Sequence, residues 1–148
     1  MTLTLGMYTD ASEAPDPLDH ALKLLNDGLF EEALNEATNL LKQDLPEVSK
    51  GSLQFILGAS TNKMGKPEFA IFHFLEGYAI IANEDQPALM GHFQDELARI
   101  LFETRNPNAS LFFTEMAISN FGIAGNAEMV DSCTKLKEEL LRSLKGSM

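Results

Sequence analysis

The chain has 148 residues, 45% hydrophobic and 22% charged, which is enough apolar material for one folded domain with a continuous core. Its net charge of −11 would repel phosphate groups, so nucleic acid and membranes are not expected as partners. A single cysteine, Cys133, excludes an intramolecular disulfide, and without a signal-peptide pattern or a membrane-spanning run we expect a cytoplasmic protein.

The N-terminal part of the chain is expected to form an arm followed by a helical hairpin. Residues 1–15 mix polar and small side chains without periodicity, which is typical of a mobile arm. Asp16 followed by Pro17 is a typical helix start, with the aspartate as N-cap and the proline at the first helical position. Apolar residues at helical spacing on both sides of Gly28 predict two helices that together cover about residues 16–44.

A second hairpin is predicted over about residues 49–83. Ser49 is expected to cap its first helix, and Gly65 to end that helix in a left-handed conformation. Pro67 starts the second helix, which extends to about Ala82 and is apolar on almost all sides. Because this helix lies in the middle of the chain, we expect neighbouring elements to cover both of its faces.

A third hairpin, over about residues 88–122, and a final helix complete the predicted fold. The second helix of this hairpin is expected over about 109–120, before a glycine-rich stop. Asn126 caps a last helix over 126–144 whose outer face is charged, as suits a terminal capping element. No segment alternates with a period of two, so the sequence predicts an all-α chain of seven helices in a single domain over residues 16–145.

Small and bulky residues recur at regular intervals through the second hairpin. They are Leu57, Gly58, Gly65, Ala70, Phe74 and Gly77. Small residues at such positions let two antiparallel helices approach closely, while bulky ones fill the groove between them. The pattern resembles the tetratricopeptide repeat, a helix-turn-helix unit with a period of roughly 34 residues.

Weaker copies of this pattern precede and follow the second hairpin. Gly28 lies 37 residues before Gly65, which indicates a first copy. Phe113 lies 39 residues after Phe74, which indicates a third. The resemblance covers about residues 16–122 and implies an α-α superhelix of about three hairpins closed by the C-terminal helix. A helical bundle of different connectivity remains the alternative fold.

The resemblance also implies a function. Tetratricopeptide repeat proteins bind an extended peptide or a helix against a concave wall formed by the first helix of each pair. Because the sequence also lacks a catalytic constellation, we expect a binding module without catalysis or a cofactor. Phe55 and Phe102 would then be apolar anchors, Asn62 would hold a peptide amide, and Lys63 and Arg99 would pair with carboxylates. The residues at the family's lining positions that we expect to contact a partner are Phe55, Ala59, Asn62, Lys63, His92, Arg99 and Phe102.

One well-known partner of the family is not expected. Clamping the C-terminal carboxylate of a cytosolic heat-shock chaperone requires a Lys and an Asn in the first repeat and a Lys and an Arg in the third. The matching positions hold Leu18 and Leu22, then His92 and Glu96. A narrower hypothesis is a protein like the bacterial secretion chaperones, which resemble this chain in length, acidity and repeat number.

Two further hypotheses differ in kind. A helical metal-binding protein or enzyme would use His92, Asp95 and Glu96, of which His92 and Glu96 share one helical face. Self-association would place the arm of residues 1–15 in a groove of a second copy. His73 and Cys133 are interpreted as a packed, hydrogen-bonded histidine and a buried, inert thiol.

Overall fold

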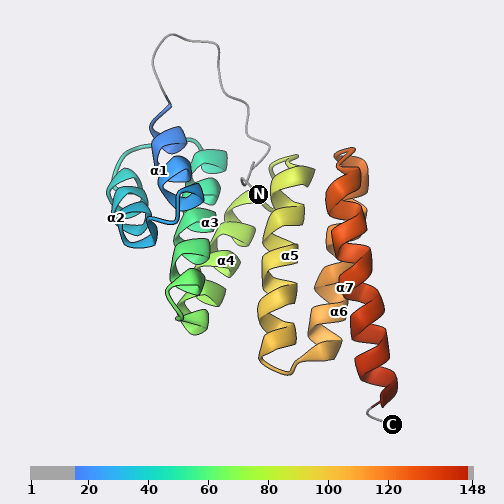
Figure 1. Ribbon diagram of the computed structural model, residues 1–148. Coiled ribbons are helices and arrows are strands. Elements are labelled where there is room, and N and C mark those ends of the chain that lie inside the picture. The colour runs from blue at the N-terminus through green and yellow to red at the C-terminus, as the bar shows by residue number, and fades with distance from the viewer. Residues whose placement is uncertain (1–15, 147–148) are drawn as a thin grey trace. The chain divides into compact units, whose positions relative to one another are not determined.

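The computed structural model describes residues 16–146, so the arm predicted over residues 1–15 lies outside the described part. The described residues form seven helices and no strand, which confirms the all-α prediction (Figure 1). None of these helices is long and apolar enough to cross a membrane. The helices are α1 (Pro17–Asn26), α2 (Phe30–Leu40), α3 (Glu47–Lys63), α4 (Pro67–Ile81), α5 (Pro87–Glu103), α6 (Pro107–Ile123) and α7 (Ala127–Gly146).

The chain divides into two compact units. Unit 1, Met1–Asp85, contains α1 to α4, and unit 2, Gln86–Met148, contains α5 to α7. In unit 1, α3 packs against α1 and α2, and α4 packs against α3. In unit 2, α6 packs against both α5 and α7.

Two of the three predicted side-chain caps are present. The backbone N–H of Leu18 donates to Asp16 Oδ1 at 3.0 Å, and that of Met129 donates to Asn126 Oδ1 at 3.1 Å. The cap predicted at Ser49 is wrong, because α3 already begins at Glu47, directly after a proline. A proline there fixes the backbone for helix entry without requiring a side-chain cap.

The predicted bounds of the sixth helix were too narrow. Helix α6 begins at Pro107, which takes a first-turn position and therefore leaves no backbone hydrogen bond unmade. It continues through Gly122 and ends at Ile123. The chain stops being helical at Gly125, where φ is +73°.

Four helix-to-helix turns use the same hydrogen-bonding pattern around a residue in the left-handed region. At Gly65, with φ of +80°, its N–H donates to Asn62 O and the next N–H to Thr61 O, at 3.0 and 2.9 Å. This arrangement satisfies the last carbonyls of the helix and favours glycine. The prediction for Gly65 is confirmed. The left-handed residues of the four turns are Gly28, Gly65, Arg105 and Gly125.

The crossing of α3 and α4 depends on glycines that face bulky side chains. A Cβ added to Gly58 would lie 2.5 Å from the ring of the fully buried Phe74. A Cβ on Gly51 would overlap the side chain of Ile81. The interpretation that small residues let these two helices approach is therefore confirmed.

Helices α5 and α6 repeat the α3–α4 hairpin with an offset of 40 residues. Pro107 starts α6 as Pro67 starts α4, and Gly91 faces the ring of Phe121 at the position where Gly51 faces Ile81. The offset corrects the predicted alignment of the third copy, because Phe74 corresponds to Thr114 rather than to Phe113. Thr114 is fully buried, whereas Phe113 is only partly buried.

Helix α7 covers the α5–α6 hairpin with its apolar side. Two clusters of buried residues form between these three helices. The first consists of Ala98, Leu136 and Leu140, and the second of Ala117, Phe121 and Cys133.

Candidate functional site

In unit 1, the residues expected to bind a partner lie along α3. Phe55 is fully buried, with its ring centroid 5.5 Å from that of Phe74, and Ala59 is also buried. Asn62 is half-buried and Lys63 is exposed. The structure thus corrects the expectation that Phe55 is an apolar anchor at the surface, because its ring already packs inside the core.

In unit 2, the expected residues lie along α5 and differ in exposure. His92 is buried, and its ring packs edge-on against Phe121 with centroids 5.0 Å apart. Phe102 is half-buried against the cluster that contains Leu136. The Arg99 side chain is 40% exposed. Of these three, only Arg99 and Phe102 have surface that a partner would reach.

Arg99 belongs to a polar network between α5 and α7. Its Nε donates to Asp95 Oδ1 and its Nη2 donates to Ser132 Oγ, both at 2.9 Å. The Cys133 thiol lies against the same Asp95 oxygen, with Sγ at 3.4 Å. Burial, followed by the neighbouring Asp95 carboxylate, raises the pKa of Cys133 to about 12. The thiol therefore stays protonated near neutral pH, and the predicted burial of Cys133 is confirmed.

A small hollow of about 190 Å³ lies beside this network. Its walls carry both charge signs, and the Arg99 guanidinium in its wall already bonds to Asp95 and Ser132. The hollow is therefore suited to a single side chain rather than to a whole ligand. It is lined by Arg99, Phe102, Glu103, Leu136 and Glu139.

The structure places the three residues of the metal hypothesis on α5 without assembling a centre. Asp95 is engaged by Arg99 and Cys133, and His92 packs against an aromatic ring. Glu96 is half-buried. Between residues 16 and 146, no group of three or more His, Cys, Asp or Glu side chains is arranged to hold a metal ion.

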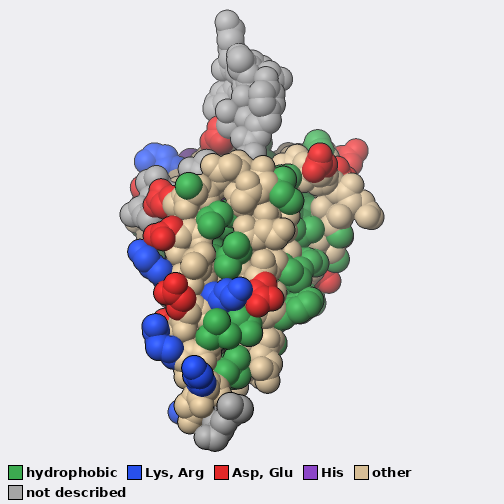
Figure 2. Space-filling view, turned by 90° about the vertical axis from the view of Figure 1, so that its right-hand side faces the viewer, with side chains coloured by type: hydrophobic (Ala, Val, Ile, Leu, Met, Phe, Trp, Pro, Cys, Tyr) green, Lys and Arg blue, Asp and Glu red, His purple; other side chains and the backbone are tan. Residues whose placement is uncertain are grey.

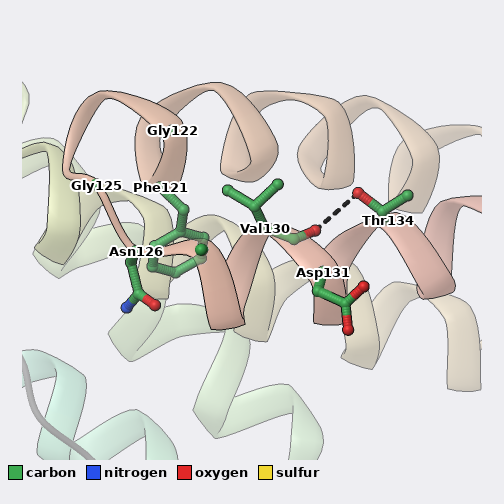
Figure 3. A pocket seen from close by; sticks show the side chains of 8 residues that line it. Phe121, Gly122, Gly125, Asn126, Val130, Asp131 and Thr134 are labelled. Carbon is green, nitrogen blue, oxygen red and sulfur yellow. Dashed lines mark hydrogen bonds between the residues drawn. The ribbon is translucent and has the colours of Figure 1, made fainter.

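A larger hollow, about 420 Å³, lies where the turn from α6 meets the first half of α7 (Figure 3). Its polar groups are already used locally. Thr134 Oγ1 donates to Val130 O at 2.7 Å, and Asp131 pairs with Lys135 at 3.0 Å. The residues that line the hollow are Phe121, Gly122, Gly125, Asn126, Ala127, Val130, Asp131 and Thr134.

The face on which α7 lies carries hydrophobic side chains interspersed with charged ones (Figure 2). Ile123, at the end of α6, and Leu141, on α7, are exposed but stand apart in the sequence, and Lys137 pairs with Glu115 at 3.6 Å between α7 and α6. Scattered exposed hydrophobic residues of this kind are normal on a protein surface.

Helix α4 carries a more concentrated apolar surface, formed by Phe69, Phe72 and Leu75. Their exposed fractions are 60%, 58% and 48%. The spacing of three residues places all three on one side of the helix, and we call this set the α4 stripe. The opposite side packs inward through residues that include Ala70 and Phe74. The expectation that both faces of this helix are covered is therefore wrong, because the side that carries the stripe is exposed. Helix α4 has more large apolar residues than one packing face needs.

The corresponding side of α6 is different. With the offset of 40, the stripe positions hold Ala109, Phe112 and Glu115. Phe112 is 61% exposed and packs edge-on against its neighbour Phe113, as Phe72 does against His73, with centroids 5.6 Å apart in both pairs. Since α6 folds and packs with one aromatic residue on this side, the fold does not require the other two apolar residues of the stripe.

His73 lies beside the stripe and faces α3. Its Nδ1 lies 2.9 Å from Gln54 Oε1, which confirms the prediction of a packed, hydrogen-bonded histidine. Burial lowers the pKa of His73, and the neighbouring Glu76 carboxylate opposes that effect. The uncharged imidazole thus supports the α3–α4 contact.

The α4 stripe was missed as a site, although the sequence contained the signal. A helix packed on one side needs about half of its positions to be apolar, whereas α4 is apolar nearly all round. Comparison of this chain with protein-family models, curated proteins and solved structures found no match. The α5–α6 hairpin is therefore the reference against which we judge the surface of α3–α4.

Proposed function

We propose that this chain is a non-catalytic interaction module that binds an apolar segment of another protein on the α4 stripe. The observation that carries the proposal is the exposure of Phe69, Phe72 and Leu75 on one side of one helix. A contiguous apolar patch of this kind is typical of protein–protein contact sites. Full burial of one such side chain contributes about 1.5–3 kcal/mol before the entropic cost of association is subtracted, so the stripe supplies the apolar part of the binding free energy.

The polar groups of unit 2 support a structural rather than a chemical role for that region. Asp95, Arg99 and Ser132 satisfy one another across α5 and α7. The raised pKa of Cys133 disfavours the thiolate that a nucleophile needs. Catalysis therefore has less support than binding.

The hairpins are, in this proposal, tetratricopeptide-like repeats. Support comes from the left-handed turn residues Gly28, Gly65 and Arg105, which recur after 37 and 40 residues, and from the glycine–aromatic crossing of α3 and α4. The contact surface proposed here lies on the second helix of a hairpin. It replaces the inner wall expected from the family, since Phe55 and His92 are buried.

Photo-crosslinking from matched positions tests the proposal. p-Benzoylphenylalanine is placed at Phe72 in one variant and at Phe112 in another, because the two rings have nearly equal exposure on equivalent helices. We expect the probe at Phe72 to capture a second protein several-fold more efficiently than the probe at Phe112. Equal capture from both positions, or none from Phe72, would contradict the proposal. Mass spectrometry of the product distinguishes a partner from a second copy of the 16.3 kDa chain.

A further inference from the structure

We infer that the segment bound by the α4 stripe is an amphipathic helix whose apolar face is flanked by Lys or Arg. This inference rests on the proposed function and adds the chemistry of the partner. It follows from the charged groups of α4, from the form of its surface and from the charges of the other candidate occupants.

Two carboxylates accompany the stripe. Glu68 in the first turn and Glu76 in the third project on the same side of α4 as Phe72, and both are exposed. Helix α4 contains no Lys or Arg, and Lys66 lies just before its start. In the described part of the chain neither glutamate forms an ion pair, although Glu76 lies near the His73 imidazole. The stripe therefore offers apolar contact together with unpaired negative charge.

Unpaired carboxylates are not seen on the equivalent side of the reference hairpin, where Glu115 pairs with Lys137 at 3.6 Å. With the offset of 40, Glu68 corresponds to Asn108 and Glu76 to Met116. The apolar residues and the carboxylates thus distinguish α4 from α6 together. A surface with exposed apolar residues and unpaired carboxylates is suited to a partner that is both apolar and basic.

The form of the surface favours a helix as the partner. The backbone of α4 is hydrogen-bonded within the helix, so the stripe offers side chains and no strand edge to pair with. Residues at i, i+3 and i+6 form a ridge about 9 Å long, which packs into the groove between side-chain rows of a second helix. An amphipathic helix lying along α4 would bury all three apolar side chains of the stripe.

Charge also distinguishes this partner from the chain's own candidates. A second copy would bring its own Glu68 and Glu76 to the interface, and like charges there oppose association. Residues 1–15 contain Asp10 and Glu13 and no Lys or Arg, so that segment has the same sign of charge. A basic helix gains from both carboxylates.

Two synthetic peptides of about 18 residues, or five helical turns, test the inference with the full chain. They share one pattern of Leu on the apolar face and differ only in carrying Lys or Glu on the flanks. Binding is measured by fluorescence anisotropy, and a circular-dichroism melt accompanies each variant. We expect micromolar affinity for the Lys peptide and affinity lower by about tenfold or more for the Glu peptide.

Variants separate the apolar contribution from the electrostatic one. Phe72→Ser and Leu75→Ser leave the net charge unchanged, and each is expected to weaken binding of the Lys peptide about tenfold, whereas the control Phe112→Ser leaves it unchanged. The double variant Glu68→Gln/Glu76→Gln is expected to weaken it by about two- to fivefold per carboxylate, with a smaller effect at high salt.

The outcomes distinguish this inference from the proposed function. Equal binding of both peptides that still depends on Phe72 would overturn the basic partner and leave the stripe as a binding site. Lys-peptide binding that is the same in wild type, Phe72→Ser and Leu75→Ser would show attraction by net charge alone and overturn both. A dimer detected by light scattering that Phe72→Ser abolishes would identify a second copy as the occupant and overturn the inference.

Discussion

The α3–α4 and α5–α6 hairpins share helix starts and crossing glycines but have surfaces of different character. Both second helices start at a proline, Pro67 and Pro107, and both crossings place a glycine against a bulky residue of the second helix. Helix α4 then exposes three large apolar side chains, whereas only Phe112 stands on the equivalent side of α6. Features shared by the two hairpins are thus those that the fold requires, and features present in one are free to serve a function.

The two hairpins also differ in the sizes of the buried residues where their helices cross. Gly58 makes room for the Phe74 ring in α3–α4. In α5–α6 the same two positions hold the buried Ala98 and Thr114, so the residue on the first helix is larger and the residue on the second is smaller. This difference provides the strongest test of the comparison.

The largest expected effect on stability follows from replacing Gly58 and Phe74 by the residues at the equivalent positions of α5–α6, which are alanine and threonine. Phe74→Thr alone should destabilise the protein by about 3–4 kcal/mol through the cavity that it leaves. Gly58→Ala alone should cost about 1–3 kcal/mol, because its Cβ collides with the ring. The double variant should cost about 1–2 kcal/mol less than the sum, since the smaller threonine admits the Cβ. Urea unfolding measures all three, and strict additivity would show that the two pairs are not equivalent.

The next effect concerns Asp95, which stands where α3 has Phe55. Because burial and Asp95 raise the pKa of Cys133 from 9.0 to about 12, the folded protein holds the thiol proton more tightly than the unfolded chain does. This tighter proton binding adds to the free energy of unfolding. The addition is complete below about pH 9 and is lost as the pH rises from 9 toward 12. Alkylation by iodoacetamide at pH 8 should be roughly a hundredfold slower in the folded protein than in urea. Equal rates would contradict the buried Asp95–Cys133 contact.

Turn residues should give smaller effects of opposite sign. Gly65 and Arg105 occupy equivalent left-handed positions, with φ of +80° and +64°. Gly65→Ala should therefore destabilise the protein by about 1 kcal/mol, and Arg105→Gly should stabilise it by up to about 1 kcal/mol. Thermal melts of the two variants provide the measurement, and shifts of the same sign would show that the two turns are not comparable.

The smallest expected effect concerns a buried hydroxyl. Ser60 is fully buried, and its Oγ has no hydrogen-bond partner among residues 16–146, whereas the equivalent residue on α5 is the apolar Ile100. Ser60→Ala removes an unsatisfied polar group and should raise the free energy of unfolding by about 0.5–1 kcal/mol. A loss of stability in chemical denaturation would indicate that the hydroxyl is bonded in solution.

Helical periodicity and glycine positions predicted most of the fold. The seven helices, the caps at Asp16 and Asn126 and the left-handed Gly65 follow from local chemistry that a short stretch of sequence contains. Phe113 was matched to Phe74 by residue type, but the shared starting prolines fix the offset at 40. Matching by residue type alone therefore misaligned the second and third copies, because equivalent buried positions hold residues of different size.

The site was harder to predict, because periodicity tells which residues share a face and not which faces are covered. Phe55 and His92 match lining positions of a repeat, yet both are buried. Phe69 and Phe72 read as core residues, yet both are exposed. Whether a face is covered depends on contacts between elements distant in sequence, which the periodicity of a single sequence does not record.

Giving α4 the surface of α6 tests the central claim most directly. The variant Phe69→Ala/Leu75→Glu keeps Phe72 and copies the side chains of Ala109 and Glu115. Its affinity for the Lys-flanked amphipathic peptide, measured by anisotropy, should fall at least about tenfold, while its melting temperature stays within about 3 °C of wild type. The added carboxylate would favour non-specific attraction, so a loss of binding reports on apolar contact. An unchanged affinity would contradict the assignment of the α4 stripe as the binding site.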